Sequence, residues 1–378
     1  MLLVTSSCLL ALLVGVVAAP EAWHLAAAPV LIVTAIHLSA GALLFRGVRA
    51  ALSAAGPVAG EMAVLREGLA LLAAQQFQSP KLRALAARVT EAGRTVGDLE
   101  LWFGVLRERT KDWFLHLSLW MAAGTQTALA LDAWRSRHAA ALPEWLDAWA
   151  EFEALQSLAC YAYENQEDCW PEVREGKPRF EASALGHPLL SRARCVANDV
   201  RLGEEPAFWV ISGSNMAGKS TLLRSVGLAC VLSQAGAPVR AARLTLSTLR
   251  VHASISILDS LQRGTSRFLA EVERLRDTLQ AASHGPVLFL FDEIFSGTNS
   301  SDRHIAADAV VGALKERGAI GAVTTHDIAL ASIARHGGKN VHMASAGGGP
   351  LDFDYLVKPR VTPETNAIAI ARMAGVPV

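Results

Sequence analysis

The sequence predicts an α/β fold, in which a mainly parallel sheet carries a P-loop and follows an all-α region with a two-helix transmembrane hairpin. Strand-like and helix-like stretches alternate over residues 179–378, which is the pattern of a parallel sheet covered by helices. Within residues 49–178, the stretch from Glu61 to Glu164 is rich in alanine and leucine and poor in β-branched residues, which favours helices. Residues 1–48 contain two long apolar runs. These three ranges are the predicted domains.

Composition limits the class of protein. The 378 residues carry 35 basic and 35 acidic side chains, so there is no overall electrostatic footprint for nucleic acid, and only local patches stay open. The five cysteines are scattered without a C-x-x-C pair, which suits a reducing compartment. The hydrophobic share of 52% is high for a soluble protein, and the excess lies at the N-terminus.

The N-terminal segment predicts a membrane anchor. Leu2–Ala19 has no charged residue, and a second apolar run covers Leu25–Phe45. Each run is near the roughly 20 residues that a helix needs to cross a bilayer. Arg46 and Arg49 follow, which predicts that the rest of the chain lies on the cytoplasmic side of a bacterial inner membrane. A secretory signal and a pair of buried core helices are the alternatives, disfavoured by the missing basic start and by the run lengths.

The helical middle shows no catalytic pattern. A helix is expected from Pro143, which is a good first-turn residue, with Trp145, Trp149 and Phe152 on one face. Such an aromatic stripe indicates core packing and needs no ligand. Another helix is expected over Lys111–His138.

A phosphate-binding P-loop is predicted between an apolar strand at Ala207–Ser212 and a helix at Thr221–Leu232. Its glycines let backbone N–H groups surround a phosphate, and the helix N-terminus adds a positive dipole end. Lys219 is expected to reach the β- and γ-phosphates of ATP, and Ser220 to ligate Mg²⁺. A glycine-rich turn that matches by chance is the alternative, which the flanking strand and helix disfavour. The expected nucleotide contacts are Gly213, Ser214, Asn215, Met216, Ala217, Gly218, Lys219, Ser220 and Thr221.

Two carboxylates follow a second apolar strand. Val287–Phe291 is the pattern of a fully buried strand, and it delivers Asp292 and Glu293 at its C-terminal end, where doubly wound sheets bind ligands. Asp292 is expected to hold Mg²⁺, directly or through water, and Glu293 to polarise the attacking water. A solvated acidic turn is the alternative.

The next strand, Gly321–Thr325, ends at His326. A histidine placed there can hydrogen-bond a γ-phosphate, whereas the alternative is a structural histidine. Between the two strands, Phe295–Asp302 is a turn rich in helix-capping residues. It is either a plain helix start or a loop that touches a partner's site.

These motifs resemble the ATPase domain of the MutS family of DNA mismatch-repair proteins. The resemblance covers about residues 180–378 in order, and Asn215 separates this P-loop from most others. The main matches are Gly213–Thr221, Asp292–Glu293 followed by Gly297–Thr298, and Thr325–His326. Smaller matches are Gly186–Pro188, Asn198–Asp199, Gln234–Pro238, Ser266–Glu271 and Asn366–Pro377.

The resemblance implies an ABC-type ATPase that works as a homodimer, with ATP, Mg²⁺ and DNA as its ligands. It implies that Ser266 points at the γ-phosphate held by the other subunit. Cys195–Val196 stand where the family usually places an aromatic residue on the adenine. The roughly 130 residues before the ATPase domain are too few for the family's connector, full lever and clamp domains. The chain therefore resembles shortened, membrane-anchored MutS-like proteins with a reduced lever or core bundle.

The sequence thus predicts a dimeric MutS-like ATPase that acts on DNA in a mismatch-repair-like role while tethered to the membrane. A membrane-embedded ABC-type ATPase for transport or remodelling is the alternative, although no Leu-Ser-Gly-Gly-Gln signature precedes Asp292. A non-enzymatic, nucleotide-gated scaffold is a third interpretation. The intact set of Lys219, Asp292, Glu293 and His326 weighs against it.

Overall fold

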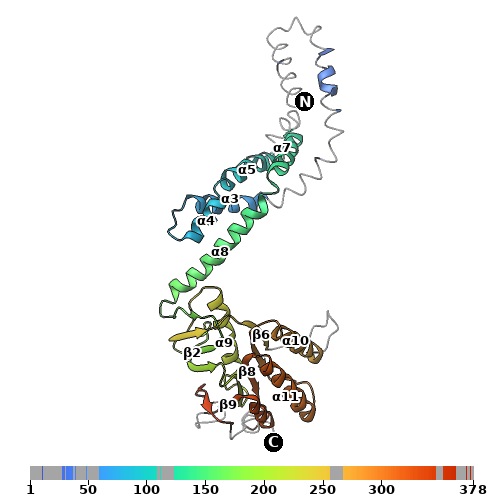
Figure 1. Cartoon of the computed structure of the whole chain (residues 1–378). Helices are drawn as coiled ribbons and strands as arrows, with labels where there is room; N and C mark the ends of the chain where they lie inside the picture. Colours follow the sequence, from blue (N-terminus) through green and yellow to red (C-terminus); the bar gives the residue numbers. More distant parts are fainter. Residues whose placement is uncertain are drawn as a thin grey trace. The chain divides into compact units, whose positions relative to one another are not determined.

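The computed structural model describes residues 59–108, 111, 123–255, 267–345 and 352–362, with short pieces and single residues before 59 and after 362. It divides into two compact units, Met1–Ser157 and Leu158–Val378 (Figure 1). The domain limits expected from the sequence, after residues 48 and 178, stay predictions.

The described part of the first unit is helical (Figure 1). Its core contains Leu69, Leu72 and Val96, and Trp145 and Trp149 pack within or against this cluster. Gly68 lets the indole of Trp149 approach, because a Cβ atom there would lie 2.3 Å from the ring. The aromatic stripe is therefore confirmed as core packing. The helices are α3 (Ala59–Ala74), α4 (Pro80–Arg88), α5 (Ala92–Glu108), α7 (Ala123–His138) and α8 (Leu142–Glu164), the last of which runs on into the second unit.

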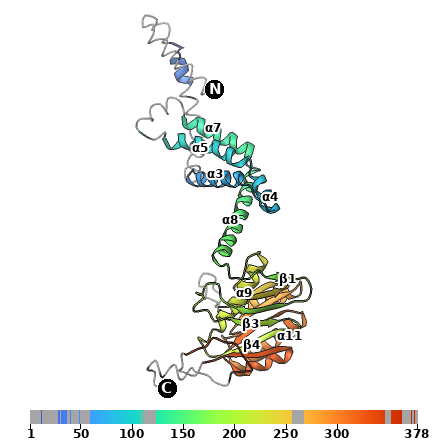
Figure 2. The ribbon, with the colours of Figure 1, turned by 90° about the vertical axis from the view of Figure 1, so that its left-hand side faces the viewer.

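A six-stranded sheet forms the centre of the second unit (Figure 2). Five of its strands are parallel, and the edge strand β10 is antiparallel to β9. In order across the sheet, the strands are β10 (Lys358–Pro359), β9 (Gly338–Met343), β4 (Phe208–Gly213), β8 (Ile320–Thr325), β7 (Val287–Asp292) and β6 (Arg250–Ser254).

Alternation along the strands divides the core between the two faces of this sheet. In β4, Trp209 and Ile211 join the cluster that includes α9, whereas Phe208 and Val210 join the cluster on the other face. β4 is buried along its whole length, so its C-terminal end, where the P-loop starts, is held firmly. The covering helices are α9 (Lys219–Gln234) on one face and α10 (Arg267–Ala282), α11 (Ser300–Glu316) and the 3₁₀ segment η3 (Ile328–His336) on the other.

A second, four-stranded sheet packs its inner face on the α9 side of this core. β2 is antiparallel to both of its neighbours, and β1 is parallel to β5. In order, the strands are β1 (Glu172–Val173), β5 (Arg243–Leu246), β2 (Phe180–Leu185) and β3 (Asn198–Leu202).

The predicted fold class was wrong in two respects. The sheets are mixed, because the six-stranded sheet has an antiparallel edge and the smaller sheet is mainly antiparallel. Within the described residues, no helix has both the length and the apolar character that a membrane crossing requires. Most of the predicted hairpin, residues 1–48, lies outside the described residues. An apolar run shows that its residues prefer a nonpolar environment. It does not show that they form a single helix that crosses a membrane. The inner-membrane location depended on that hairpin and was wrong with it.

Candidate functional site

The loop between β4 and α9 has the tight backbone that its glycines predict. Gly213 adopts a φ of 144°, and a Cβ atom there would lie 2.1 Å from the carbonyl oxygen of Met343. Gly218 caps α9 in the left-handed conformation, with a φ of 97°. A side chain at Gly213 would therefore push the loop away from β9, and only glycine fits.

Lys219 is the first residue of α9, and only 5% of it is exposed. Its Nζ atom donates hydrogen bonds to the carbonyl oxygens of Gly213 and Ser214, each at 2.8 Å. Burial lowers the pKa of Lys219, while Glu293 and Asp292 oppose that shift. No ion pair joins Lys219 to a carboxylate in the described residues. A buried ammonium held by neutral carbonyls is an electrostatic environment that favours an incoming anion.

Asp292 and Glu293 are positioned by Thr324 on the neighbouring strand β8. Thr324 lies opposite Asp292 in the strand register and is fully buried. Its Oγ1 donates to Asp292 Oδ1 at 2.5 Å and accepts from the backbone N–H of Glu293 at 3.0 Å. Glu293 itself has a φ of 54°, a conformation that is uncommon for a residue with a side chain. Thr324 therefore supports both acids, and nothing in a single-strand pattern indicated it.

His326 and Glu293 come together at the ends of two adjacent strands. The Nδ1 atom of His326 lies 3.3 Å from Glu293 Oε1. Both side chains are partly exposed, at 50% and 31%, so they can reach a ligand. The structure brings the two side chains together, and their roles stay predictions.

The loop that follows Glu293 is held at several backbone atoms. Glu271 on α10 is 4% exposed, and its Oε1 accepts from the N–H of Phe295 at 2.6 Å. Arg303 on α11 donates to three carbonyl oxygens of the loop, at 3.1 to 3.3 Å, namely those of Phe295, Ser296 and Thr298. Sequence reasoning missed both side chains, because a lone acid or base on a helix carries no motif.

A cavity of about 680 Å³ lies beside the P-loop. Six of the predicted P-loop residues and Glu293 line it. Cys195, Val196, His187 and Tyr355 also belong to its lining. The P-loop members of the lining are Asn215, Met216, Gly218, Lys219, Ser220 and Thr221.

Tyr355 is an aromatic residue of this lining that sequence reasoning missed. Its ring lies over the P-loop, since a Cβ atom at Gly218 would be 3.1 Å from Tyr355 Cδ1. Asn198 fixes its backbone by donating to the Tyr355 carbonyl oxygen at 3.0 Å and accepting from the N–H of Val357 at 2.7 Å. Asn198 is one of the smaller matches noted in the sequence, and its contacts explain why an amide is useful there.

The remaining predicted site residues can be placed only in part. Ser266 lies outside the described residues, so its expected role in the other subunit's site stays a prediction. Within the described part of the chain, no cluster of three or more His, Cys, Asp or Glu residues could hold a metal ion. The sequence predicted only two protein ligands for Mg²⁺, Ser220 and Asp292. Two are compatible with this ion, because Mg²⁺ usually keeps several waters and phosphate oxygens as its other ligands.

Comparison with known proteins decides the family. Residues 209–378 match the family model of MutS domain V. The chain belongs to the MutS family.

Relatives of this MutS-family chain include the DNA mismatch repair protein MutS of Thermus aquaticus, 35% identical over 253 residues, which are 64% of this chain and 29% of that protein. Endonuclease MutS2 of Thermus thermophilus is 36% identical over 208 residues, 53% of this chain and 27% of that protein. The DNA mismatch repair protein MSH6 of Arabidopsis thaliana is 31% identical over 259 residues, 61% of this chain and 19% of that protein. The chain therefore spans less than a third of the length of each of these relatives.

Proposed function

We propose that this chain is a dimeric ATPase that binds and hydrolyses Mg²⁺-ATP at the P-loop and acts on DNA in a mismatch-repair-like process. The observation that carries the proposal is the buried Lys219, which lines the cavity and, among the residues that the structure describes, is held by two carbonyl oxygens and forms no ion pair. Glu293 and His326 meet at the edge of the same site. Membership of the MutS family supports the assignment.

The residues of this site fit a nucleoside triphosphate. The backbone N–H groups at the start of α9 are free of intrahelical partners, and the helix dipole favours phosphate there. Lys219 would exchange its two carbonyl contacts for phosphate oxygens. Tyr355 offers an aromatic face on the cavity wall, where Cys195 has none, so it can stack on the base. A Mg²⁺ ion held by Ser220 and Asp292 would neutralise charge on the phosphates.

Hydrolysis then depends on positioning by a few side chains. Glu293 accepts a hydrogen bond from the attacking water and polarises it. Thr324 keeps the Glu293 backbone in place, and His326 is close enough to the carboxylate to orient it or to contact the γ-phosphate. Lys219 stabilises the charge that develops on the transferred phosphoryl oxygens.

A composite site formed by two subunits is part of the proposal. α10 starts directly after Ser266, and the Phe268 ring packs near Phe295, with centroids 6.3 Å apart. Ser266 therefore precedes a helix that packs against the loop after Glu293. Such a surface can present both elements to a second copy of the chain, as the resemblance implies.

The ATPase assignment is tested with the full chain. Glu293→Gln should bind ATP with near wild-type affinity and turn it over roughly 100-fold more slowly, since general base catalysis contributes that order of rate. Lys219→Ala should weaken ATP binding. Phosphate release and fluorescent-nucleotide titration measure the two effects. Glu273→Gln, which removes an exposed acid on α10, is the matched control. Unchanged turnover in the Glu293 variant would remove it as the base.

DNA is proposed as the partner because the relatives from Thermus aquaticus and Arabidopsis thaliana are named DNA mismatch repair proteins. The test compares the ATPase rate without DNA and with matched, mismatched and branched duplexes. A rate that rises with one of these DNA forms supports the partner. A rate that none of them changes contradicts it and leaves the ATPase assignment standing.

A further inference from the structure

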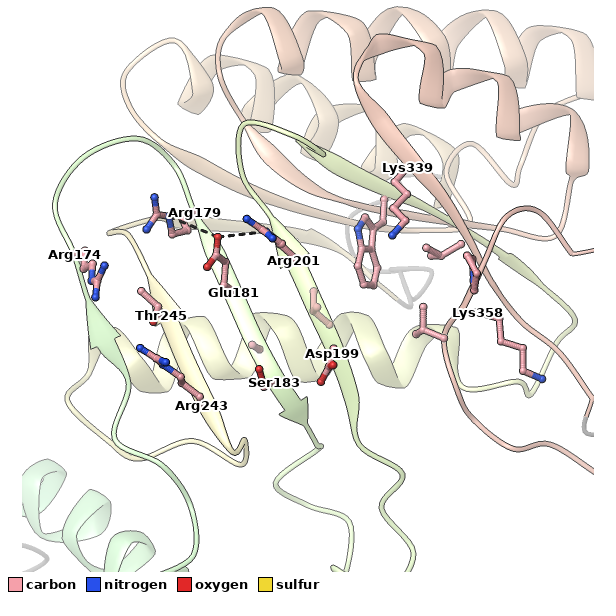
Figure 3. Close-up of a pocket in the computed structure, with 16 residues that line it drawn as sticks. Arg174, Arg179, Glu181, Ser183, Asp199, Arg201, Arg243, Thr245, Lys339 and Lys358 are labelled. Atoms are coloured by element: carbon pink, nitrogen blue, oxygen red, sulfur yellow. Dashed lines mark ion pairs between the residues drawn. The ribbon is translucent and has the colours of Figure 1, made fainter.

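A second cavity, of about 700 Å³, lies on the outer face of the four-stranded sheet and extends to β9 and β10 (Figure 3). It shares no lining residue with the cavity beside the P-loop. We call it the basic groove, because six cationic side chains and only two carboxylates, Glu181 and Asp199, line it. The cations are Arg174, Arg179, Arg201, Arg243, Lys339 and Lys358.

Strand alternation explains why charge collects on this face. In β2, Phe180 and Ala182 point into the core, so Glu181 and Ser183 point outward. The strand register then places Arg201 on β3 opposite Glu181, and Arg243 on β5 opposite Ser183. No described helix contributes a lining residue to this face.

Both lining carboxylates are already engaged. Glu181 Oε1 lies 3.5 Å from Arg201 Nε and 3.9 Å from Arg179 Nε, so two arginines share one acid (Figure 3). Asp199 Oδ1 accepts from the backbone N–H of Ala184 at 2.8 Å.

At the rim, Glu172 pairs with Arg174 at 2.8 Å, and the hydrogen bond from Arg174 is the largest cause that lowers the Glu172 pKa, with a smaller contribution from Arg243. In the described residues, no ion pair is formed by Arg243 or Lys339. These pairs are exposed and therefore weak, so the arginines can exchange carboxylate for phosphate at little cost.

A buried donor faces the same groove. Trp209 is 5% exposed and lines the cavity, and its indole Nε1 has no hydrogen-bond partner among the described residues. The register of β4 with β9 places Trp209 directly beside Lys339. Buried N–H groups nearly always find an acceptor, so this donor beside a lysine is available to an oxygen of an anionic ligand.

We propose that the basic groove binds the phosphate backbone of duplex DNA. Four of the six cations are arginines, whose planar fork fits phosphate oxygens in pairs. The labelled side chains are spread along the face, from Arg174 and Arg243 on one side to Lys339 and Lys358 on the other (Figure 3). Such spacing suits a repeating polyanion better than one small anion, and binding gains from counterion release. The proposal rests on the proposed role on DNA and adds a contact surface to it.

The test measures duplex DNA binding by the full chain. The probe is a fluorescently labelled duplex of about 30 base pairs. Its binding is followed by anisotropy at about 50, 100 and 200 mM NaCl, the range in which phosphate contacts are sensitive to salt. Arg243→Glu with Lys339→Glu should weaken binding at least about tenfold at 100 mM and lower the log–log salt slope by about two. Trp209→Phe removes the N–H donor together with part of the buried ring, so its thermal unfolding is compared with the wild type, and it should weaken binding roughly threefold.

The matched control is Arg274→Glu with Arg276→Glu, which makes the same change in net charge on exposed positions of α10. This control should change binding less than about twofold. The basal ATPase rate should stay at the wild-type value in both double variants, because none of these residues lines the P-loop cavity.

Each outcome decides between the claims. Weaker DNA binding in the groove variant alone, with normal ATPase activity, supports the groove. Equal losses in the groove and control variants, or no loss in either, overturn it. A wild-type chain that hydrolyses ATP but binds heparin and not DNA also overturns it, and the groove is then a site for another acidic polymer. A chain that binds DNA through the groove without ATPase activity contradicts the proposed function and leaves the groove standing.

Discussion

Tyr355 lies outside every motif of the sequence and lines the cavity beside the P-loop. By resemblance, Cys195 stands where an aromatic residue was expected against the base, and Cys195 lines the same cavity. Tyr355 reaches the same cavity from a segment about 160 residues later, where its φ of 55° and the contacts of Asn198 hold it. Under the proposed function, Tyr355 would take the place of the aromatic residue that the Cys195 position lacks.

We predict that Tyr355→Ala weakens ATP binding roughly tenfold with little change in the turnover rate, because base–aromatic stacking contributes about 1–3 kcal/mol. Tyr355→Phe keeps the ring and should bind ATP as the wild type does. Nucleotide titration and steady-state kinetics measure both quantities. If the alanine variant binds ATP normally, Tyr355 does not contact the base.

At the scale of elements, the loop after β7 links two helices to the strand that carries Asp292. Phe295 has a φ of 54°, and the buried carboxylate of Glu271 accepts from its N–H. Arg303 holds the carbonyl side of the same turn. Glu293 stands at the start of this loop, so α10 and α11 together determine where its carboxylate lies.

We predict that Glu271→Leu lowers the turnover rate about tenfold while changing the KM for ATP less than about twofold, because a 1 Å displacement of a catalytic group can cost more than that. Glu271→Gln retains an acceptor oxygen and should recover most of the rate. Steady-state kinetics separates the two effects. Equal losses in kcat and in affinity would show a general destabilisation of the fold, and thermal unfolding of both variants is the control.

A second element connection joins α8 to the wall of the P-loop cavity. The Tyr161 hydroxyl donates to Asp168 Oδ2 at 2.6 Å, and Arg192 donates to Asp168 Oδ1 at 2.7 Å. Burial, followed by the Asp168 contact, raises the pKa of Tyr161 to about 12. Arg192 belongs to the segment that continues into Arg194 and Cys195 of the cavity wall. These contacts therefore connect the end of α8 to the lining of the P-loop cavity.

At the scale of the whole molecule, the proposed composite site would make activity depend on two copies of the chain. We predict that Lys219→Ala and Ser266→Ala chains are each inactive alone and recover activity when mixed. A mixed dimer keeps one intact site, formed by the P-loop of one chain and Ser266 of the other, so random mixing should give about a quarter of the wild-type rate. Phosphate release from the two chains, alone and mixed, measures the recovery.

Separate sites within each chain would give no recovery at any mixing ratio, and that result contradicts the composite site. The control mixture combines Lys219→Ala chains with Glu293→Gln chains. Each change disables the P-loop site of the chain that carries it, so no mixed dimer has an intact site and no activity should be recovered.

The parts of the fold that the sequence predicted well are the buried parallel strands. β4, β7 and β8 are nearly continuous apolar runs because helices cover both faces of their sheet, and such runs are easily recognised. β2, β3 and β5 were not expected as a sheet, because one face of each is polar and the strands are short. The membrane hairpin was wrong for a related reason, since hydropathy alone does not establish an element.

By itself, the sequence determined the local chemistry of the P-loop and the identity of the two acids after β7. These residues are contiguous, so their spacing carries the geometry: Gly213 and Gly218 turn the backbone, and Lys219 begins the helix. Only the tertiary structure decided which distant residues complete the site, namely Thr324, Glu271 and Tyr355. The same is true of the basic groove, since strand order and register bring its cations together. Register is a property of paired strands, and no single stretch of sequence contains it.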